Sequence, residues 1–389
     1  MDIKRLGEIC DIVSGGTPSR TNTKFWDGGI IPWIKIGNIK EKYVSEADEY
    51  ITQAGLEGSS AKMLSKGTIL YTIFATLGEV GILTIDACTN QAIAGITIKN
   101  QDEVLTDYLY YYLKSKKSYV NNLGRGVAQN NINMSILRNL EVPLPALSVQ
   151  RQTVTILDRT AKVVKYRQQQ LQELDDLVKA RFVELVGDTF LNSKAWSEVP
   201  LETMADVVSG ITKGRKTREQ NLVEVPYMAV SNVKEGYIDW TTVKTIEATE
   251  QEIDQYRLLP DDVLMTEGGD PDKLGRGAII KTLLENCIHQ NHIFRVRLDK
   301  QRILPVYFEE YLQHQRAKRY FLRCAKQTTG IASINMKQLR ALPVLVPPLK
   351  LQEQFAAFVE QIDKSKNAIQ IALDETQLLF DSLMQKYFR

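Results

Sequence analysis

The sequence predicts an α+β protein in which two similar mixed α/β modules are separated by two long antiparallel coiled-coil helices with pseudo-two-fold symmetry. Three observations lead to this prediction. A module of about 145 residues occurs twice, each copy combines short β-rich segments with amphipathic helical patterns, and each copy runs directly into a long helical pattern with a seven-residue apolar period.

The duplication is clearest at the end of each copy. The segments "NINMSILRNLEVPLPALSVQRQ" (131–152) and "SINMKQLRALPVLVPPLKLQEQ" (333–354) are identical at half of their 22 positions. The openings "LGEICDIVSGG" (6–16) and "LETMADVVSGI" (201–211) also match. The copies therefore share their ends and differ by insertions between them. We expect a first module at 1–145, a first long helix at 146–190, a second module at 191–347 and a second long helix at 348–389.

Within each module, apolar β-rich segments such as "IIPWIKIGNI" and "VEVPYMAVSNV" are typical of buried strands. Later in each copy a strand, a glycine-rich loop and a second strand are expected, followed by an amphipathic helix. Helical spacing assigns the aromatic and leucine side chains of these two helices to the core and not to base stacking; they are Tyr108, Tyr111, Tyr112, Tyr119, Phe308, Tyr311, Leu312 and Tyr320.

The two long helices are predicted from the absence of helix breakers. Val149 to Val186 contains neither Pro nor Gly, which gives about 38 helical residues and roughly 57 Å. Lys366 interrupts the apolar seam of the second helix. We expect the two helices to pack on each other, although packing on their own modules or homo-oligomerisation are alternatives. The expected contact residues are Leu157, Val164, Leu171, Leu174, Val178, Leu185, Phe355, Val359, Ile362, Ile369, Leu373, Phe380 and Leu383.

Composition sets wide limits on function. The net charge of +2 does not favour a protein that coats nucleic acid by bulk electrostatics, but it allows local basic loops. The sequence contains no run of 18 apolar residues and no signal-peptide pattern, so we expect a cytoplasmic protein without a membrane segment. The four cysteines lie far apart, without metal-ligand spacing, and are expected to be reduced thiols.

The ordered set of openings, closings and long helices resembles the specificity subunit of type I restriction–modification systems over essentially the whole chain. This resemblance implies that each module is a target recognition domain that reads one half of a split DNA sequence. It also implies that the helices fix the gap between the half-sites. Two modification subunits, which methylate adenine with S-adenosylmethionine, are expected to dock beside the helices. Two restriction subunits that use ATP and magnesium are further possible partners.

The resemblance implies a chain that is not itself an enzyme, without a cofactor of its own, and the motifs agree. We find no methyltransferase motif of the Asp/Asn-Pro-Pro-aromatic type. In "SGITKGRKT", Arg215 stands where the lysine of a phosphate-binding loop is required. The "GGDPDKLGRG" loop lacks dinucleotide-binding spacing. His289 and His292 are expected on opposite faces of a strand, so no metal site is predicted.

Polar loops flanked by shared framework are the candidates for DNA contact, because Arg, Lys, Asn and Gln read base edges and bind phosphates. In the first module these are Arg20, Thr21, Asn22, Lys24, Lys35, Asn38, Arg125, Gln129 and Asn130. In the second they are Lys213, Arg215, Lys216, Arg218, Asn232, Lys234, Lys273, Arg276, Gln290, Asn291, His292, Lys326, Gln327 and Thr328. Any one of them is alternatively a solvated loop residue.

Two further functions stay open at this point. One is a coiled-coil scaffold without DNA specificity, and the other is a self-contained nuclease that carries these modules as appendages. Asn133 and Asn335 occupy equivalent positions in the two closings, and we expect them to cap a turn there and not to read bases.

Overall fold

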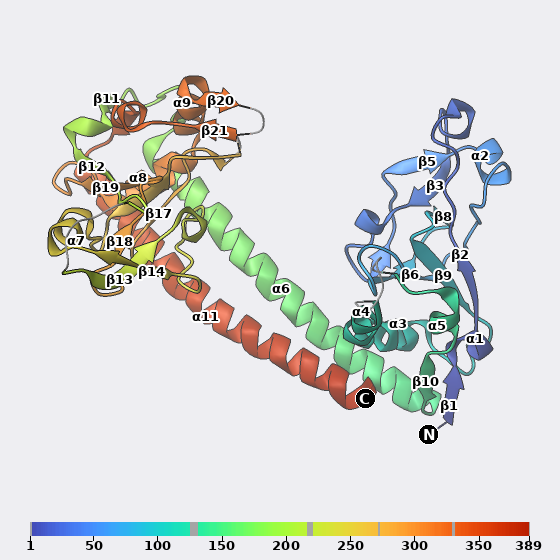
Figure 1. Ribbon diagram of the computed structural model, residues 1–389. Coiled ribbons are helices and arrows are strands. Elements are labelled where there is room, and N and C mark those ends of the chain that lie inside the picture. Colours follow the sequence, from blue (N-terminus) through green and yellow to red (C-terminus); the bar gives the residue numbers. More distant parts are fainter. Residues whose placement is uncertain (1, 125–130, 216–220, 271–272, 329–330, 389) are drawn as a thin grey trace. The chain divides into compact units, whose positions relative to one another are not determined.

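The chain forms two compact units, Met1–Gln168 with Ile371–Arg389, and Gln169–Gln370. A computed structural model describes residues 2–124, 131–215, 221–270, 273–328 and 331–388 (Figure 1). Each unit contains one module together with one half of each long helix. Over those ranges, none of the helices combines the length and the apolar character needed to span a membrane.

The first module is built on two sheets. One sheet has the strand order β2-β9-β6-β7-β4 and the other has the order β5-β3-β8. Their bounds are β2 (Cys10–Ser14), β3 (Ile31–Ile34), β4 (Tyr43–Val44), β5 (Glu49–Ile51), β6 (Ile69–Thr72), β7 (Val80–Leu83), β8 (Cys88–Thr89) and β9 (Ile93–Ile98). The pairing is antiparallel except for β3 with β8 and β4 with β7. A separate antiparallel pair, β1 (Asp2–Arg5) with β10 (Glu141–Leu144), joins the two ends of the module.

The second module repeats this plan. Its sheets have the orders β12-β19-β15-β17 and β14-β13-β18, and a further small sheet has the order β16-β21-β20. The bounds are β12 (Ala205–Ser209), β13 (Val223–Met228), β14 (Lys244–Ala248), β15 (Val263–Thr266), β16 (Gly268–Gly269), β17 (Gly277–Ile279), β18 (Ile288–His289), β19 (Ile293–Leu298), β20 (Lys326–Thr328) and β21 (Ile331–Ser333). The pair of β11 (Ser197–Pro200) with β22 (Pro343–Val346) again joins the module's ends. Matching strand orders show that the sequence repeat is a structural repeat.

The shared Ser-Gly at the end of β2 and β12 has a packing reason. A Cβ on Gly15 would lie 2.2 Å from the carbonyl oxygen of Asn90, and one on Gly210 would lie 1.9 Å from that of His289. Both glycines therefore let the chain pass against the backbone at the end of the parallel strand β8 or β18. This contact fixes where the loop after β2 or β12 begins.

Short helices complete the modules. Those of the first unit are α1 (Leu6–Ile9), α2 (Gln53–Glu57), α3 (Thr106–Ser115), α4 (Lys117–Gly124) and α5 (Met134–Arg138), with 3-10 turns η1 (Thr23–Phe25) and η2 (Ile36–Asn38). Those of the second are α7 (Glu250–Tyr256), α8 (Pro305–Gln313), α9 (Gln315–Cys324) and α10 (Met336–Arg340), with η3 (Leu201–Thr203) and η4 (Val230–Asn232). Asn133 and Asn335 accept from the backbone N–H of Ile136 and Gln338 and so cap α5 and α10, short helices that precede the predicted strands.

Each predicted amphipathic helix is broken in two, at Lys116 between α3 and α4 and at His314 between α8 and α9. The break carries Tyr119 onto the solvent side of α4, where it is 54% exposed, so its predicted place in the core is wrong. The other seven aromatic and leucine positions predicted for the core are buried or partly buried. The tyrosine-rich stretch of α3 is thus core packing and not a base-stacking platform.

The long helices are α6 (Leu147–Val186) and α11 (Leu349–Phe388), each of 40 residues. In the first unit Leu157 of α6 shares an apolar cluster with Phe380 of α11, and Arg167 donates to the carbonyl oxygen of Ala372. In the second unit the rings of Phe182 and Phe355 lie 5.3 Å apart. Each unit therefore contains side-chain contact between the two helices.

None of the positions predicted to lie in the helix-pair contact is exposed to solvent. Leu157, Leu185, Phe355, Ile362, Leu373 and Phe380 are buried, and Val164, Leu171, Leu174, Val178, Val359, Ile369 and Leu383 are partly buried. Lys366, which interrupts the apolar seam, forms an ion pair with Asp175 of α6 in the second unit. The charge of the Lys366 ammonium group is therefore balanced by Asp175 within a row of otherwise apolar contacts.

Candidate nucleic-acid interface

In the first module, the loop after β2 carries an arginine that is held on three sides. The Arg20 guanidinium lies 3.8 Å from the ring centroid of Trp26 and 5.0 Å from that of Trp33. Its Nη1 forms an ion pair with Glu49 at the start of β5, which also accepts from Lys35. The structure thus brings together two predicted DNA-contact residues, Arg20 and Lys35, on one carboxylate.

The aromatic floor beneath Arg20 is itself fixed. The Trp26 and Trp33 rings meet edge to face, with centroids 5.1 Å apart and an angle of 87° between their planes. The Trp26 indole N–H donates to the carbonyl oxygen of Ser19 at 3.1 Å, and that of Trp33 donates to Gly16 at 2.9 Å. Because both rings are anchored to the backbone of the same loop, Arg20 rests on a rigid surface.

The Glu49 carboxylate stays charged near neutral pH. The hydrogen bonds from Arg20 and then from Lys35 hold the pKa of Glu49 below its usual value. The ion pairs leave Arg20 half exposed, with 54% of its side chain accessible. The first module therefore presents an ordered cation at its surface.

In the second module the corresponding loop carries Arg215, and its arrangement is different. Nε and Nη2 of Arg215 both donate to the Glu252 carboxylate, and Nη2 also lies 3.2 Å from the carbonyl oxygen of Glu247. Glu252 is the capping-box residue of α7, where its carboxylate accepts from the backbone N–H of Thr249 at 2.9 Å. The Nε–Nη2 edge of Arg215, which could otherwise form two parallel hydrogen bonds to a ligand, is therefore occupied within the module.

The two asparagines that follow the equivalent strands β3 and β13 are turn residues. Asn38 accepts from the backbone N–H of Lys35 at 2.8 Å, and Asn232 accepts from that of Ala229 at 2.9 Å. Asn232 is fully buried, and its amide nitrogen donates to Asp239 and Thr242. Asn232 was predicted to contact DNA, but it has no exposed polar atom, so this assignment is corrected to a structural role.

A second group of predicted residues surrounds the end of β15. His292 pairs with Glu267 at 2.6 Å, and Asn291 lies 3.5 Å from the His292 ring. Gln290 accepts from the backbone N–H of Val230. Lys273 pairs with Asp270, and Arg276 is half buried.

The remaining predicted residues fall into three sets. Thr21, Lys24, Lys213 and Lys326 are exposed, whereas Asn22 and Lys234 are partly buried. Gln327 and Thr328 belong to β20, whose side chains at these positions lie outside the described set. Arg125, Gln129, Asn130, Lys216 and Arg218 lie outside the described residues.

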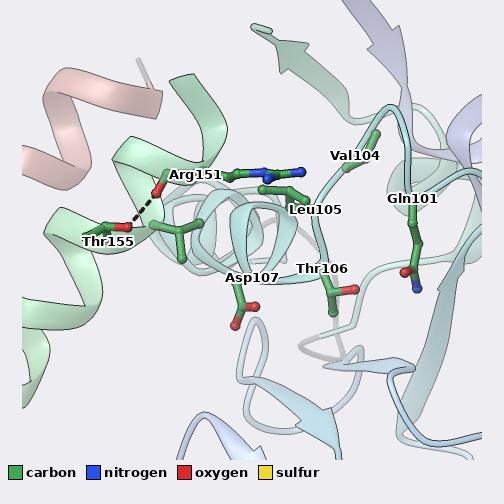
Figure 2. Close-up of a pocket in the computed structure, with 8 residues that line it drawn as sticks. Gln101, Val104, Leu105, Thr106, Asp107, Arg151 and Thr155 are labelled. Atoms are coloured by element: carbon green, nitrogen blue, oxygen red, sulfur yellow. Dashed lines mark hydrogen bonds between the residues drawn. The ribbon is translucent and has the colours of Figure 1, made fainter. Parts of the chain in front are cut away.

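Two hollows in the surface lie away from the predicted DNA-contact residues. One of about 480 Å³ in the first unit lies between the start of α3 and α6 (Figure 2). Its lining is Gln101, Val104, Leu105, Thr106, Asp107, Arg151, Val154 and Thr155, none of them a predicted DNA-contact residue. A larger hollow of about 850 Å³ in the second unit lies against α6, α8 and α11. Neither of these two hollows is lined by a predicted DNA-contact residue.

The two histidines of "HQNH" do not form a metal site. His289 is buried, with its ring nitrogens facing the carbonyl oxygens of Tyr256 and Val208 at 3.1 and 3.4 Å. His292 lies beyond the end of β18 and pairs with Glu267, so the expected reason, opposite faces of one strand, is wrong for His292. Within the described ranges, no group of three or more His, Cys, Asp or Glu residues could hold a metal ion.

A comparison with known protein families identifies the repeated unit. The family model described as type I restriction modification DNA specificity domain matches residues 1–176 and again residues 193–375. The chain belongs to this specificity family. Both matches begin in a module and continue into the long helix that follows it, so the family's unit is a module with its helix.

Some individual members of the specificity family match most or all of the chain. The type I restriction enzyme EcoKI specificity subunit of Escherichia coli K12 is 22% identical over 382 residues, covering 92% of this chain and 82% of the relative. A solved type I S subunit from M. genitalium matches with a TM-score of 0.55 at 15% identity, covering 100% of this chain and 96% of the other. A structure from work on assembly of the type I R-M system matches with a TM-score of 0.60 at 16% identity, covering 100% and 97%. These structures share the fold.

Three residues of the candidate interface were not predicted from the family pattern or from the loops. Trp26, Glu49 and Glu252 hold Arg20 or Arg215, but no charge pattern in the sequence links a carboxylate to an arginine on a different element. Of these three residues, only Trp26 could have been found from the sequence, because aromatic residues directly follow a basic polar loop there.

Proposed function

We propose that this chain is a DNA-reading subunit in which each module recognises one half of a bipartite target. The observation that carries the proposal is the repeat of one module topology, each time followed by a 40-residue helix. A protein that reads a single continuous sequence does not need two such units. Two related modules with different loops suit a target with two different halves.

The DNA-contacting set follows from the loops. It comprises the predicted residues without Asn232, and the exposed lysines Lys24, Lys213 and Lys326 suit phosphate contacts. With a net charge of +2, the chain alone is expected to bind DNA weakly. Tight binding then requires partners that supply further positive charge.

The two helices are proposed to act together as an antiparallel coiled-coil spacer with pseudo-two-fold symmetry. Contacts inside the second unit support an antiparallel order, because Asp175 meets Lys366, whereas Phe182 meets Phe355. Partner numbers on α11 thus fall as those on α6 rise. A pair of this kind would fix the distance between the two half-sites.

Modification subunits are proposed to dock on the helices. Both helices expose apolar side chains, including Tyr166 of α6 at 50% and Ile371 and Leu378 of α11 at 61% and 69%. Exposed apolar residues in such number are typical of a surface that binds protein. The chemistry is assigned to those partners, with S-adenosylmethionine on the modification subunits and ATP with magnesium on restriction subunits. The complex is expected to act in the cytoplasm.

Module exchange is the test of the reading role. Residues 1–145 are replaced by the equivalent module of another specificity subunit, and the chain is co-expressed with modification subunits. Methylome sequencing should then show one changed half-site and one unchanged half-site. A change in both half-sites would contradict the modular assignment.

Binding measurements separate the alternatives. The isolated chain should bind duplex DNA weakly and lose affinity steeply with salt, and two modification subunits should make the binding tight and sequence-selective. Cleavage or methylation by the purified chain alone would favour a self-contained enzyme. A chain that pulls down neither modification subunits nor DNA would favour a scaffold. The variant Leu378→Glu should reduce co-purification of modification subunits, whereas the exposed polar control Gln377→Glu should not.

A further inference from the structure

Arg20 and Arg215 differ in which of their donors are free. In Arg20, Nη1 is engaged by Glu49, while Nε and Nη2 have no hydrogen-bond partner in the part of the chain that the structure describes. In Arg215, Nε and Nη2 are the atoms that Glu252 takes. Of these two arginines, Arg20 is therefore the one whose Nε–H and Nη2–H edge is available to a ligand.

The free edge of Arg20 has a fixed plane. The guanidinium lies on Trp26 and near Trp33, and both indoles are hydrogen-bonded to the loop that carries Arg20. The Glu49 carboxylate forms an ion pair with Nη1 and so restrains the guanidinium within that plane. The entropy cost of ordering a long side chain is therefore already met before a ligand arrives.

We infer that Arg20 is a specificity-determining residue that reads a guanine in the half-site of the first module, with Trp26 and Glu49 as its positioning residues. This inference rests on the proposed function. Two adjacent N–H donors match the O6 and N7 acceptors that guanine presents in the major groove. No other base presents two acceptors side by side at that edge.

A phosphate is the competing ligand, and the surroundings of Arg20 disfavour it. The Glu49 carboxylate directly beside Nη1 would repel a phosphate oxygen, whereas the edge of guanine carries no net charge. Lys35, which shares the Glu49 carboxylate with Arg20, is itself paired there. Lys24 on the same loop is exposed and has no such carboxylate partner among the described residues, which suits a phosphate contact.

The test uses the full chain assembled with its modification subunits. Binding is measured by competition with duplexes in which each base pair of the first half-site is changed in turn, and methylome sequencing gives the same preferences in cells. The variants are Arg20→Ala, Arg20→Lys and Glu49→Gln, with Lys24→Ala as the matched control. Thermal unfolding of each variant shows that the first unit remains folded.

Arg20→Ala and Arg20→Lys should reduce the preference for guanine at one position of the first half-site by about 5- to 150-fold, leaving the second half-site unchanged. Glu49→Gln should weaken the same preference although Arg20 is intact, which a purely structural role of Arg20 does not predict. Lys24→Ala should lower affinity equally for all sequences and reduce its dependence on salt.

Three results would overturn the assignment. Unchanged base preferences in Arg20→Ala, a uniform loss of affinity like that of Lys24→Ala, or relaxation at a position that is not guanine would each exclude a guanine reader. Failure of the proposed function gives a different result, because the unmodified chain with its modification subunits would then show no bipartite motif at all.

Discussion

Gln150 and Gln352 make the same three hydrogen bonds in the two units. The Gln150 side chain accepts from the backbone N–H of Leu105 at 3.0 Å and donates to the carbonyl oxygens of Glu103 and Pro145, both at 2.9 Å. Gln352 accepts from Leu304 at 2.8 Å and donates to Arg302 and Pro347 at 3.1 and 2.9 Å. Each amide ties the start of a long helix to the segment that leads into α3 or α8.

Removing this link should destabilise the unit concerned. Both glutamines are almost fully buried, so Gln150→Met or Gln352→Met leaves three backbone groups without partners. We expect a loss of about 2–4 kcal/mol in the free energy of unfolding. Urea unfolding of the purified chain measures it, with the exposed neighbours Gln152→Met and Gln354→Met as controls. Equal effects at Gln150 and Gln152 would contradict the structural role.

Phe182 is the aromatic anchor of α6 in the second unit. Its ring is fully buried and lies 5.4 Å from Tyr307 and 4.4 Å from His314. Phe182→Ala should cost about 3–5 kcal/mol of stability, because it removes a large buried ring from a packed cluster. The next residue, Val183, is 46% exposed, so Val183→Ala should change stability by less than about 0.5 kcal/mol in chemical denaturation.

The buried His289 should make the second unit sensitive to acid. Burial lowers the pKa of His289 from its ordinary 6.5 to about 4. Its stabilising contribution is therefore complete above pH 6.5 and is lost as the pH falls toward 4, by up to about 3 kcal/mol. In His289→Gln the loss of stability between pH 7 and pH 4 should be correspondingly smaller. An NMR titration in which His289 titrates near pH 6.5 would contradict this.

Glu309 should have the opposite dependence on pH. Burial raises the pKa of its carboxyl to about 7, although the backbone N–H of Ile279 donates to it. The protonated form is favoured in the folded state, so stability is lost as the pH rises from about 4.5 through 7. Glu309→Gln should therefore raise the melting temperature at pH 8 and have little effect near pH 5. The neighbouring Glu310→Gln is the control, and an equal effect of both substitutions would argue against a specific role of Glu309.

Shortening both helices by one heptad tests the spacer role. Deleting residues 168–174 and 367–373 removes roughly 10 Å from each helix, and the gap between the half-sites should shrink by about three base pairs. Deleting only one of the two segments breaks the pairing and should abolish methylation. Methylome sequencing measures both results, and an unchanged gap in the double deletion would exclude the spacer.

The sequence predicted the features that depend on local pattern. Two modules, two long helices and the capping role of Asn133 and Asn335 follow from repeats, apolar period and turn chemistry. Tyr119 was misplaced because the pattern did not reveal the helix break at Lys116. Asn232 resembled a loop residue, yet the equivalent turn buries its amide. The carboxylates that hold Arg20 and Arg215 come from other elements, so only the folded chain reveals them.

The pairing of β1 with β10, and of β11 with β22, has a consequence for how such a protein changes over time. Each ribbon brings the entry and exit of a module together just before the helix begins. An insertion inside the module therefore lengthens a loop without moving the point where the helix starts. New loop lengths, and with them new contacts, are tolerated without resetting the geometry of the rest of the chain.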